Sequence, residues 1–448
     1  MKRLWIKNPL ACFASSDCSG GLLIEGSLIR ECIPAGASPS RGWDEVFDAR
    51  RHVVLPGLIN CHHHFYQTLT RALPAALDKA LFPWLKSLYP VWAGLSEEMI
   101  FLSSKLAMAE LLLSGCTTAS DHHYLFPQGL DHAIDLQVNA ATEMGIRVVL
   151  TRGSMSLGEA DGGLPPQRVV QTHSEILADS QRLIERYHQS GDNAMVQIAL
   201  APCSPFSVTK NIMLDSATLA EQYGVRLHTH LAETLDEEAF CLKRFNCRTV
   251  DYLESVGWLG SNTWLAHGIH FDDDEIKRLG HAGVGICHCP SSNMILSSGM
   301  CRTLELEAAG CAVGLGVDGS ASNDGSNMIA EVRQAFLLQR LRYGACNVSH
   351  KDALRWATVG GASVLGRTDI GAIEPGKRAD LALFTLDEAR FCGSHDPLAA
   401  LVLCGAQQAD SVMVAGDWRV QQGHIIGLDL AELMHQHQHA ANQLAVAL

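Results

Sequence analysis

Histidine and acidic side chains stand directly after several short apolar runs of this sequence, which has 21 histidines in 448 residues. Imidazole and carboxylate groups are the ligands that zinc and similar divalent ions take in catalytic sites. The candidates at such positions are His62, His64, His230, His267, His288 and Asp318, with Glu233 three residues after His230. Alternate residues of a strand share a face, so His62 and His64 are expected to point the same way and His63 the opposite way.

These residues can meet only if the apolar runs before them are strands of one sheet. Eight such runs occur, at residues 58–61, 117–120, 148–151, 196–200, 225–228, 263–266, 284–287 and 313–317. Helical patterns separate most of them, for example over residues 100–113 and 174–187. Eight strands alternating with helices predict a (β/α)8 TIM barrel, an α/β fold. A doubly wound open sheet is the alternative, but its first strand would lead into a glycine-rich turn rather than into histidines.

A parallel barrel brings the carboxyl ends of its strands to one mouth, where barrel active sites are built. Three imidazoles and a carboxylate around an open position there suit a catalytic zinc ion, which keeps room for water. A single buried histidine is more often a hydrogen-bonded structural residue than a metal ligand. The zinc hypothesis therefore rests on the placement of several histidines and an aspartate together at strand ends. We interpret His52, His63, His122 and His123 as structural residues or as partners of the ligands, and His288 is ambiguous.

The two ends of the chain predict a second, smaller unit. Strand patterns occur at residues 22–24, 46–47, 53–55, 379–384 and 411–414. Neither end has enough strands for a stable sheet, so we expect both to form one small β-sandwich-like domain. The expected division is 1–56 and 368–448 for this domain, including a terminal helix, and 57–367 for the barrel. We interpret the histidine-rich tract 434–440 as part of a solvated helix rather than a metal site.

Composition disfavours several classes of partner. Acidic residues outnumber basic ones, 48 to 34, which gives a formal net charge of −14. Such a chain lacks the positive charge that nucleic acids and anionic membranes attract, and no apolar run approaches the about 18 residues of a membrane span. The first residues are a poor signal peptide, and the fifteen cysteines follow no regular framework. We expect a cytoplasmic protein with reduced thiols that binds a small molecule; homo-oligomerisation is left open.

Several motifs together resemble those of the amidohydrolase superfamily, in its mononuclear deaminase and chlorohydrolase branch. They are Pro-Gly-Leu-Ile-Asn-Cys-His-His-His at 56–64, His230-x-x-Glu233, Ala266-His267-Gly268, Gly316-Val317-Asp318-Gly319 and the stretch from Gly371 to Leu383. The resemblance covers nearly the whole chain. It implies a metal-dependent hydrolase that removes an amine from a heterocycle.

The resemblance implies a role for each residue at a strand end. The implied metal ligands are His62, His64, His230 and Asp318. Glu233 would protonate a ring nitrogen, Asp318 would accept a proton from the attacking water, and His267 would help to position that water. Members with two metals bridge them with a carboxylated lysine after the fourth strand, where this sequence has Ala201-Pro202-Cys203, so one zinc ion is expected. We interpret the acidic residues that follow Glu233, namely Asp236, Glu237 and Glu238, as ordinary surface carboxylates.

Four residues are interpreted as substrate contacts. They are Gln67, Trp84, Cys203 and Arg71. Gln67 resembles an amide that contacts the ring in related deaminases, and Trp84 lies in a segment that resembles an aromatic loop over the pocket. Cys203 stands where many relatives carry histidine, which disfavours an adenosine-type substrate. Arg71 and Arg152 could meet oxo groups of a ring, or could be structural ion-pair partners.

Longer stretches resemble bacterial members of this branch that act on oxidised purines. They are residues 62–71, 151–159 and 288–294. This resemblance implies that 8-oxoguanine and water are converted to urate and ammonia. Deamination of isoxanthopterin or guanine, and hydrolysis of hydroxylated atrazine-type aminotriazines, are the alternatives.

Two further classes of function are less well supported by the sequence. A catalytically dead assembly protein of this superfamily would be expected to lose ligands, yet all four and Glu233 are present. A polynucleotide deaminase is suggested by His173-Ser174-Glu175, but Pro202-Cys203 is followed by Ser204-Pro205-Phe206 rather than by the second cysteine that such enzymes require. The sequence therefore predicts an enzyme that acts on a free base.

Overall fold

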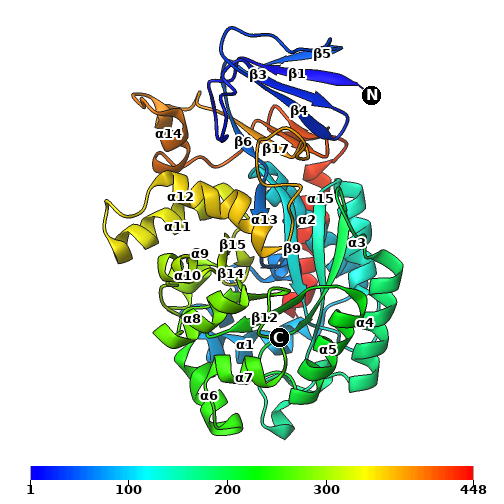
Figure 1. Ribbon diagram of the computed structural model, residues 1–448. Helices are drawn as coiled ribbons and strands as arrows, with labels where there is room; N and C mark the ends of the chain where they lie inside the picture. Colours follow the sequence, from blue (N-terminus) through cyan, green and yellow to red (C-terminus); the bar gives the residue numbers. More distant parts are fainter. Residues whose placement is uncertain (1, 447–448) are drawn as a thin grey trace.

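The computed structural model describes residues 2–446, which form a closed parallel barrel with a two-sheet domain at one end (Figure 1). Neighbouring barrel strands pair in chain order, and the last strand pairs with the first. The strands are β7 Leu58–Asn60, β9 Cys116–His123, β10 Arg147–Ser154, β11 Val196–Pro202, β12 Leu227–Leu231, β13 Thr263–His267, β14 Gly285–His288 and β15 Ala312–Leu315. Each coincides with one of the eight apolar runs, so the predicted TIM barrel is confirmed.

Helices surround the barrel, and several of them pack against its strands. They are α1 Leu81–Trp92, α2 Glu97–Leu113, α3 Ala133–Met144, α4 His173–Tyr187, α5 Lys210–Tyr223, α6 Leu235–Phe245, α7 Thr249–Ser255, α8 Asp273–Ala282, α9 Pro290–Ile295, α10 Thr303–Ala309, α11 Met328–Tyr343, α12 His350–Arg355, α13 Gly361–Val364, α14 Pro397–Leu403 and α15 Leu430–Val446, with shorter helical turns such as η1 Phe65–Thr70. Both predicted helices form, and each begins at a capping side chain: Ser96 accepts from the third residue of α2, and Thr172 forms a capping box with Glu175 in α4.

A short strand pair extends the barrel where its first and last strands meet. β8 (His63–His64) lies parallel to β16 (Asp318–Gly319), with Asp318 opposite His63 and Gly319 opposite His64. This pairing places a histidine and an aspartate at the same edge of the mouth. A side chain at Gly319 would put its Cβ 1.8 Å from Gln67 Oε1, so a larger residue would displace the Gln67 amide.

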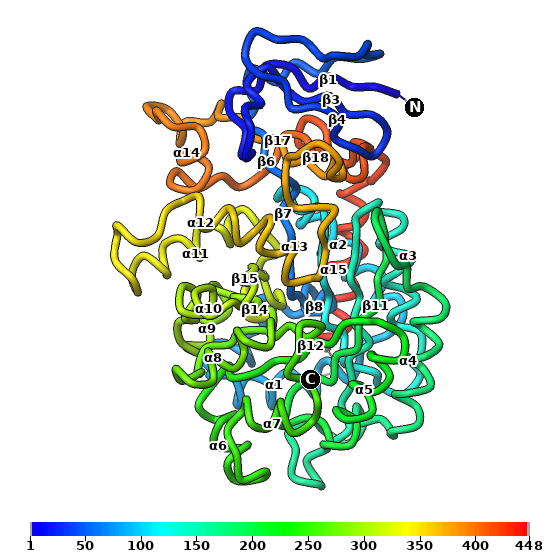
Figure 2. Tube along the Cα trace, in the orientation of Figure 1, coloured from blue at the N-terminus to red at the C-terminus, as the bar shows by residue number. Residues whose placement is uncertain are grey.

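The two chain ends form the smaller domain together. One sheet has the order β4-β3-β1-β5, and the other β2-β6-β17-β18-β19-β20. Their strands are β1 Arg3–Lys7, β2 Ala11–Cys12, β3 Gly21–Glu25, β4 Leu28–Ile33, β5 Glu45–Asp48, β6 His52–Pro56, β17 Leu381–Thr385, β18 Ser411–Val414, β19 Asp417–Gln421 and β20 His424–Ile425. Ile24 of the first sheet and Val54 and Leu381 of the second share one buried core. The sandwich-like domain built from both ends is therefore confirmed, and Figure 2 shows β6 running directly into β7 of the barrel.

The terminal helix α15 packs against α2 rather than standing free in solvent. Its buried side chains include Leu433, His437 and Leu444, and His437 Nε2 lies 2.9 Å from Thr68 Oγ1 of η1. The neighbouring His435 and His439 are exposed. The expectation of a solvated helix is thus wrong for the face that carries His437, because the apolar residues beside it pack onto the barrel.

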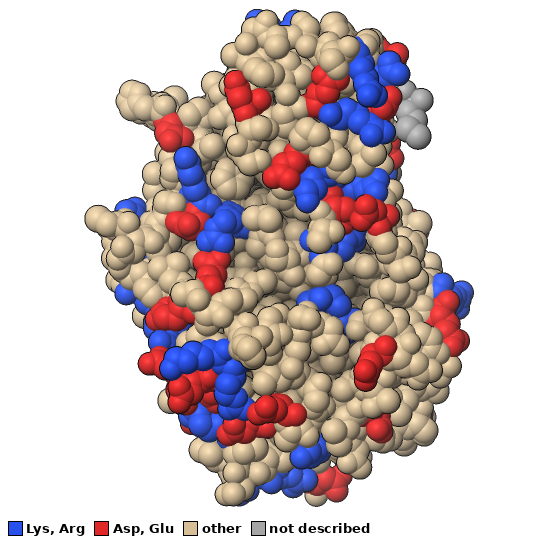
Figure 3. Space-filling model, viewed as in Figure 1, with Lys and Arg blue, Asp and Glu red and all other residues tan. Residues whose placement is uncertain are grey.

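Charged residues of both signs are interspersed on the face drawn in Figure 3, and many of them form ion pairs, for example Arg302 with Asp273 at 2.7 Å. The cysteines are all free thiols. Within residues 2–446, no helix combines the length and the apolar character needed to cross a bilayer.

A buried ion pair joins the barrel to the two-sheet domain, and we expect its loss to destabilise the protein. Arg147 at the start of β10 donates to both carboxylate oxygens of Asp380, at 3.1 and 3.2 Å. Asp380→Asn should lower the free energy of unfolding by about 3–5 kcal/mol, because the guanidinium stays buried without its counter-charge. Denaturant titration measures this. The control is Asp274→Asn, which breaks an exposed pair with Lys277 and should change stability by less than about 1 kcal/mol; equal effects would contradict the prediction.

Candidate metal-dependent active site

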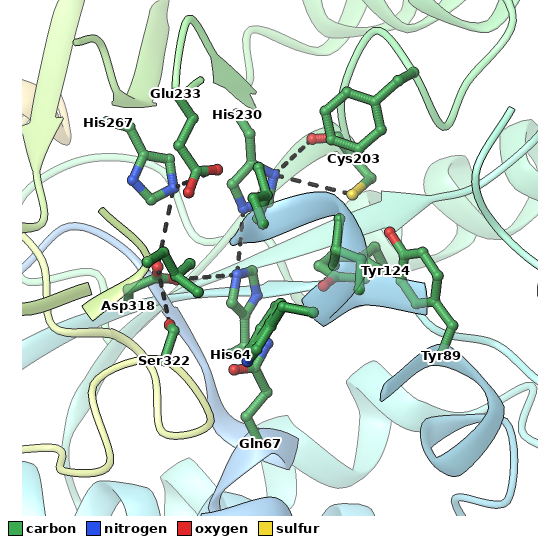
Figure 4. A pocket seen from close by; sticks show the side chains of 15 residues that line it. His64, Gln67, Tyr89, Tyr124, Cys203, His230, Glu233, His267, Asp318 and Ser322 are labelled. Carbon is green, nitrogen blue, oxygen red and sulfur yellow. Dashed lines mark hydrogen bonds and ion pairs between the residues drawn. The ribbon is translucent and has the colours of Figure 1, made fainter. Parts of the chain in front are cut away.

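The four expected ligands converge at the mouth of the barrel, and Figure 4 shows His64, His230 and Asp318 of this set. Asp318 Oδ1 lies 3.3 Å from His62 Nε2 and 3.2 Å from His64 Nε2, and His230 Nε2 lies 3.3 Å from His64 Nε2. The ligand atoms of His62, His64, His122 and His230 lie within 4.8 Å of one another. Residues separated by up to 256 positions thus reach a common point, since the barrel closes between β15 and β7.

Backbone carbonyl groups fix which nitrogen of two of these rings carries the proton. His64 Nδ1 lies 2.7 Å from the carbonyl oxygen of His122, and His230 Nδ1 lies 2.7 Å from that of Cys203. A carbonyl oxygen only accepts, so in both rings Nδ1 carries the hydrogen. Each ring therefore presents the lone pair of Nε2 to the centre, which is the form that binds a metal.

For His62, another histidine, His228, fixes which ring nitrogen carries the hydrogen. His228 Nδ1 donates to the carbonyl oxygen of Trp264 at 2.9 Å, which leaves His228 Nε2 as an acceptor. His62 Nδ1 lies 2.8 Å from that atom and donates to it. His62 Nε2 is consequently unprotonated, and it has no hydrogen-bond partner within residues 2–446.

The donor set fits a zinc ion. Burial lowers the pKa of His62, and it lowers the pKa of His230 to about 3, so both rings are neutral at neutral pH. Three neutral imidazole nitrogens and one carboxylate oxygen match the ligands of catalytic zinc sites. His122 lies beside this set with its ring stacked on His230 at 4.7 Å between centroids, and its Nε2 is bonded to the carbonyl oxygen of Ala201.

Two further groups face the ligands. Glu233 Oε2 lies 3.5 Å from His267 Nε2, which is 3.9 Å from Asp318 Oδ2. His267 Nδ1 lies 3.0 Å from Asn293 Oδ1, and Ser298 donates to Glu233 Oε1 at 3.3 Å. Burial raises the pKa of Glu233, which favours its protonated form. The arrangement can therefore hold a proton between two carboxylates and an imidazole beside a metal.

Three of the residues at the mouth adopt a left-handed backbone conformation. The φ angles are 54° at Ala232, 73° at His267 and 61° at Asp318. This conformation costs on the order of 1–3 kcal/mol for a residue that is not glycine, and it clusters at functional sites. Here it occurs at or just after a strand, where the chain must turn a side chain or a loop toward the centre of the mouth.

Glu237 anchors the loop that carries Glu233. Its side chain is buried and accepts from the backbone N–H groups of Ala232 at 3.0 Å and Glu233 at 2.9 Å. The interpretation of Glu237 as a surface carboxylate is therefore wrong. Asp236 is exposed, as that interpretation expects. Glu237 is buried because α6 begins at Leu235, and the first turn of this helix directs the Glu237 side chain inward.

Two other buried carboxylates anchor catalytic loops in the same way. Asp121 accepts from the N–H of Phe65, the residue after His64, at 2.6 Å. Glu331 accepts from Ser291 through both its N–H at 2.8 Å and its hydroxyl at 2.6 Å, at the start of α9. Sequence reasoning missed both residues, because their partners lie 56 and 40 positions away.

A narrow pocket opens onto the candidate metal site. Gln67, Trp84 and Cys203 line it, as expected, together with aromatic and aliphatic side chains of α1. Trp84 stands in the first turn of α1 rather than in a loop, because the helix begins at Leu81. The free space is about 30 Å³, room for about two water molecules. A larger ligand therefore requires α1 or neighbouring side chains to move.

Arg71 lies outside this pocket. It forms an ion pair with Glu110 of α2 and lines a separate cavity beneath α15. Arg152 is likewise buried away from the pocket, where it pairs with Asp179 at 2.7 Å and covers the ring of Phe126. Both arginines are therefore ion-pair partners within the protein, and we do not retain Arg71 as a substrate contact.

The remaining histidines near strands have partners outside the site. His63 bonds to Ser326 at 2.9 Å, and His123 bonds to the carbonyl oxygen of Leu125 at 2.7 Å. His288 is bonded to Gln339 at 3.1 Å, and His52 pairs with Asp410 at 3.0 Å. The family motif favours His230 over His228 as the ligand, because it places the ligand three residues before Glu233. The sequence did not predict that His228 contacts His62, although His228 shares a strand face with His230.

The chain is similar to hydrolases of known activity. The Amidohydrolase family model matches residues 53–419. An 8-oxoguanine deaminase from Pseudomonas aeruginosa is 66% identical over 446 residues, which are 99% of each chain. An isoxanthopterin deaminase from an unknown prokaryotic organism is 34% identical over 89% of this chain and 87% of that protein. The crystal structure of atrazine chlorohydrolase from Arthrobacter aurescens, complexed with zinc, is 31% identical with a TM-score of 0.92 over 98% of this chain and 100% of that one.

We expect the ring of His228 to control the affinity for zinc. His228→Ala removes the acceptor that fixes the tautomer of His62, which should weaken zinc binding by about 10–100-fold. Competition with a chromophoric chelator measures the affinity. His228→Gln, whose amide oxygen can accept, should recover part of it. The control is His288→Ala, which should bind zinc as the unmodified protein does; equal losses in both alanine variants would contradict the prediction.

We also expect Glu237 to act on catalysis through Glu233. Glu237→Gln keeps the shape of the side chain but loses one of the two acceptors, so the loop shifts and kcat should fall on the order of 10²-fold. Steady-state kinetics on the zinc-loaded variant measures this, with zinc content unchanged. Asp236→Asn removes the neighbouring exposed charge and should leave kcat unchanged. A normal kcat for Glu237→Gln would show that the anchor is dispensable.

Proposed function

The chain belongs to the amidohydrolase family, and we propose that it is a hydrolytic deaminase that converts 8-oxoguanine and water to urate and ammonia. The observation that carries this proposal is the 66% identity to an 8-oxoguanine deaminase over 99% of both chains. The isoxanthopterin and triazine enzymes share the fold at 34% and 31% identity, so their substrates are weaker candidates.

His62, His64, His230 and Asp318 would hold one zinc ion. The convergence of three unprotonated Nε2 atoms on a carboxylate supports this assignment, as does the zinc in the related crystal structure. When bound, zinc supplies a Lewis acid that makes water a nucleophile at neutral pH. β11 is followed by Cys203 where a metal-bridging lysine would stand, which supports a single ion.

The protein's own groups then move the protons. Asp318 Oδ2 accepts a proton from the attacking water, and Glu233 Oε2 gives a proton to the ring nitrogen beside the carbon that bears the amine. This makes that carbon more electrophilic. His267 Nε2, which lies 3.5 Å from Glu233 and 3.9 Å from Asp318, orients the water between them. Asp318 then gives its proton to the amine, the C–N bond breaks and ammonia leaves. The new hydroxyl group on that carbon returns its proton to Glu233 as it becomes a carbonyl. Each positioned group contributes about 10²–10⁴ in rate.

The pocket would hold the ring through shape and a few polar contacts. The indole N–H of Trp84 donates to the carbonyl oxygen of Ala321 at 3.1 Å, so this side chain offers only its apolar face to the ring. Burial raises the pKa of Cys203 to about 12, so its thiol stays neutral. Gln67 Oε1 accepts from Ala321 N–H at 3.3 Å, and its amide nitrogen donates to the Tyr66 hydroxyl at 3.5 Å, which leaves one amide N–H for a ring oxygen or nitrogen.

We propose that this reaction takes place in the cytoplasm and that its substrate is the free base rather than a nucleotide. Fifteen free thiols are in the state that a reducing compartment maintains. The pocket also carries no arginine or lysine that would hold the phosphate of a nucleotide.

The test is turnover of 8-oxoguanine by zinc-loaded protein, measured as release of both urate and ammonia. Glu233→Gln should lower kcat by about 10²–10⁴ while zinc content stays unchanged, because the proton donor is lost. Glu221→Gln, on the exposed side of α5, should behave as the unmodified protein does. Turnover of isoxanthopterin or a hydroxytriazine with none of 8-oxoguanine would overturn the substrate assignment, and full turnover after removal of all metal would overturn the metal assignment.

A further inference from the structure

Tyr89 carries a hydroxyl group that has no partner in the protein. The residue is 1% exposed and belongs to α1, the helix that closes the pocket. Among the buried side-chain nitrogen and oxygen atoms of the residues that line the pocket, its hydroxyl is the only one without a hydrogen-bond partner in the described part of the chain. A buried hydroxyl without a partner costs free energy, so a ligand that supplies the partner is the natural explanation.

Several other polar groups at the pocket are already engaged. Ser322 donates to Asp318 at 3.3 Å, and Ser298 donates to Glu233 at the same distance. The indole of Trp84 is held by a carbonyl group, as described above. Burial raises the pKa of Tyr89, so its hydroxyl keeps its proton and is a donor at all physiological pH values. Tyr89 is thus a buried donor that no group in the described part of the chain uses, in addition to the amide N–H that Gln67 offers to the pocket.

The position of Tyr89 identifies the part of the substrate that it meets. Figure 4 shows it on the side of the pocket away from Asp318, His267 and Glu233. In the proposed reaction, on which this inference rests, the amine-bearing carbon C2 of the purine must lie at those three residues. The C8 oxo group is at the opposite end of the fused rings from C2. The ring therefore spans the pocket with its C8 oxygen toward α1.

We propose that the Tyr89 hydroxyl donates a hydrogen bond to the C8 oxo group and thereby selects 8-oxoguanine over guanine. Guanine has a C–H in place of this oxygen and leaves the hydroxyl unpaired. A site built to hydrogen-bond a substrate group rejects the analogue that lacks it, because its own buried polar group then stays unsatisfied. The aliphatic side chains of Leu81, Leu85 and Leu296 around the pocket offer no alternative partner.

The experiment compares two ligands that differ at C8 and in the hydrogen on the ring nitrogen next to it. Urate carries the C8 oxo group and xanthine does not, so calorimetry on zinc-loaded protein gives the contribution of that group. Tyr89→Phe should raise the dissociation constant of urate about 10-fold or more and change that of xanthine by less than about 2-fold. It should lower kcat/KM for 8-oxoguanine by a similar factor. Tyr223→Phe, which removes an exposed hydroxyl bonded to Glu185, is the matched control and should change none of these values.

The possible outcomes separate this proposal from its alternatives. Equal weakening of urate and xanthine, or a lower thermal midpoint of the ligand-free variant, would assign Tyr89 a structural role and overturn the inference. Unchanged urate affinity would overturn it as well. The midpoint is expected to stay the same or to rise, because the variant removes only an unpaired buried hydroxyl. Failure of the unmodified protein to turn over 8-oxoguanine would instead refute the proposed function, independently of the urate and xanthine comparison.

Discussion

Each imidazole at the centre of this protein can present its Nε2 lone pair only because its Nδ1–H has an acceptor in the barrel itself. For His64 and His230 the acceptor is a backbone carbonyl, and for His62 it is His228, which a backbone carbonyl fixes in turn. Backbone carbonyls of barrel strands cannot rotate away as side chains can. The sheet that holds the fold together therefore also fixes the protonation pattern of the metal site.

The loops that carry the acid–base groups need a different kind of support. Ala232, His267 and Asp318 adopt a strained backbone that would relax if the loops were free. Buried carboxylates behind the loops, such as Glu237 beneath Glu233, accept the backbone N–H groups there and oppose that relaxation. The strain and the anchors together place two carboxylates within 4 Å of one imidazole in a buried site, where each charge acts strongly.

The chemistry and the selection of the substrate come from different layers of the structure. The strands and their anchors supply the proposed metal ligands and proton carriers. The helix α1 covers the pocket and supplies Trp84 and Tyr89, which line it. Because α1 is tied to the mouth by few polar contacts, among them Trp84 to Ala321, it can differ or move without disturbing the metal site.

The sequence alone predicted the barrel, the pairing of the chain ends and the histidine and acidic residues that meet at the mouth, because strand periodicity and short spacings such as His62-x-His64 and His230-x-x-Glu233 are local features of the chain. It did not reveal His228 as the partner of His62, since that contact spans 166 positions and exists only once the barrel closes. The sequence also did not predict which polar side chains are buried. Glu237 and His437 belong to polar stretches, but both are buried because of where their helices pack. Arg71 points away from the pocket and forms an ion pair with Glu110. Which polar atoms end up unpaired in a closed pocket, as at Tyr89, depends on every neighbour at once, and only the tertiary structure decides it.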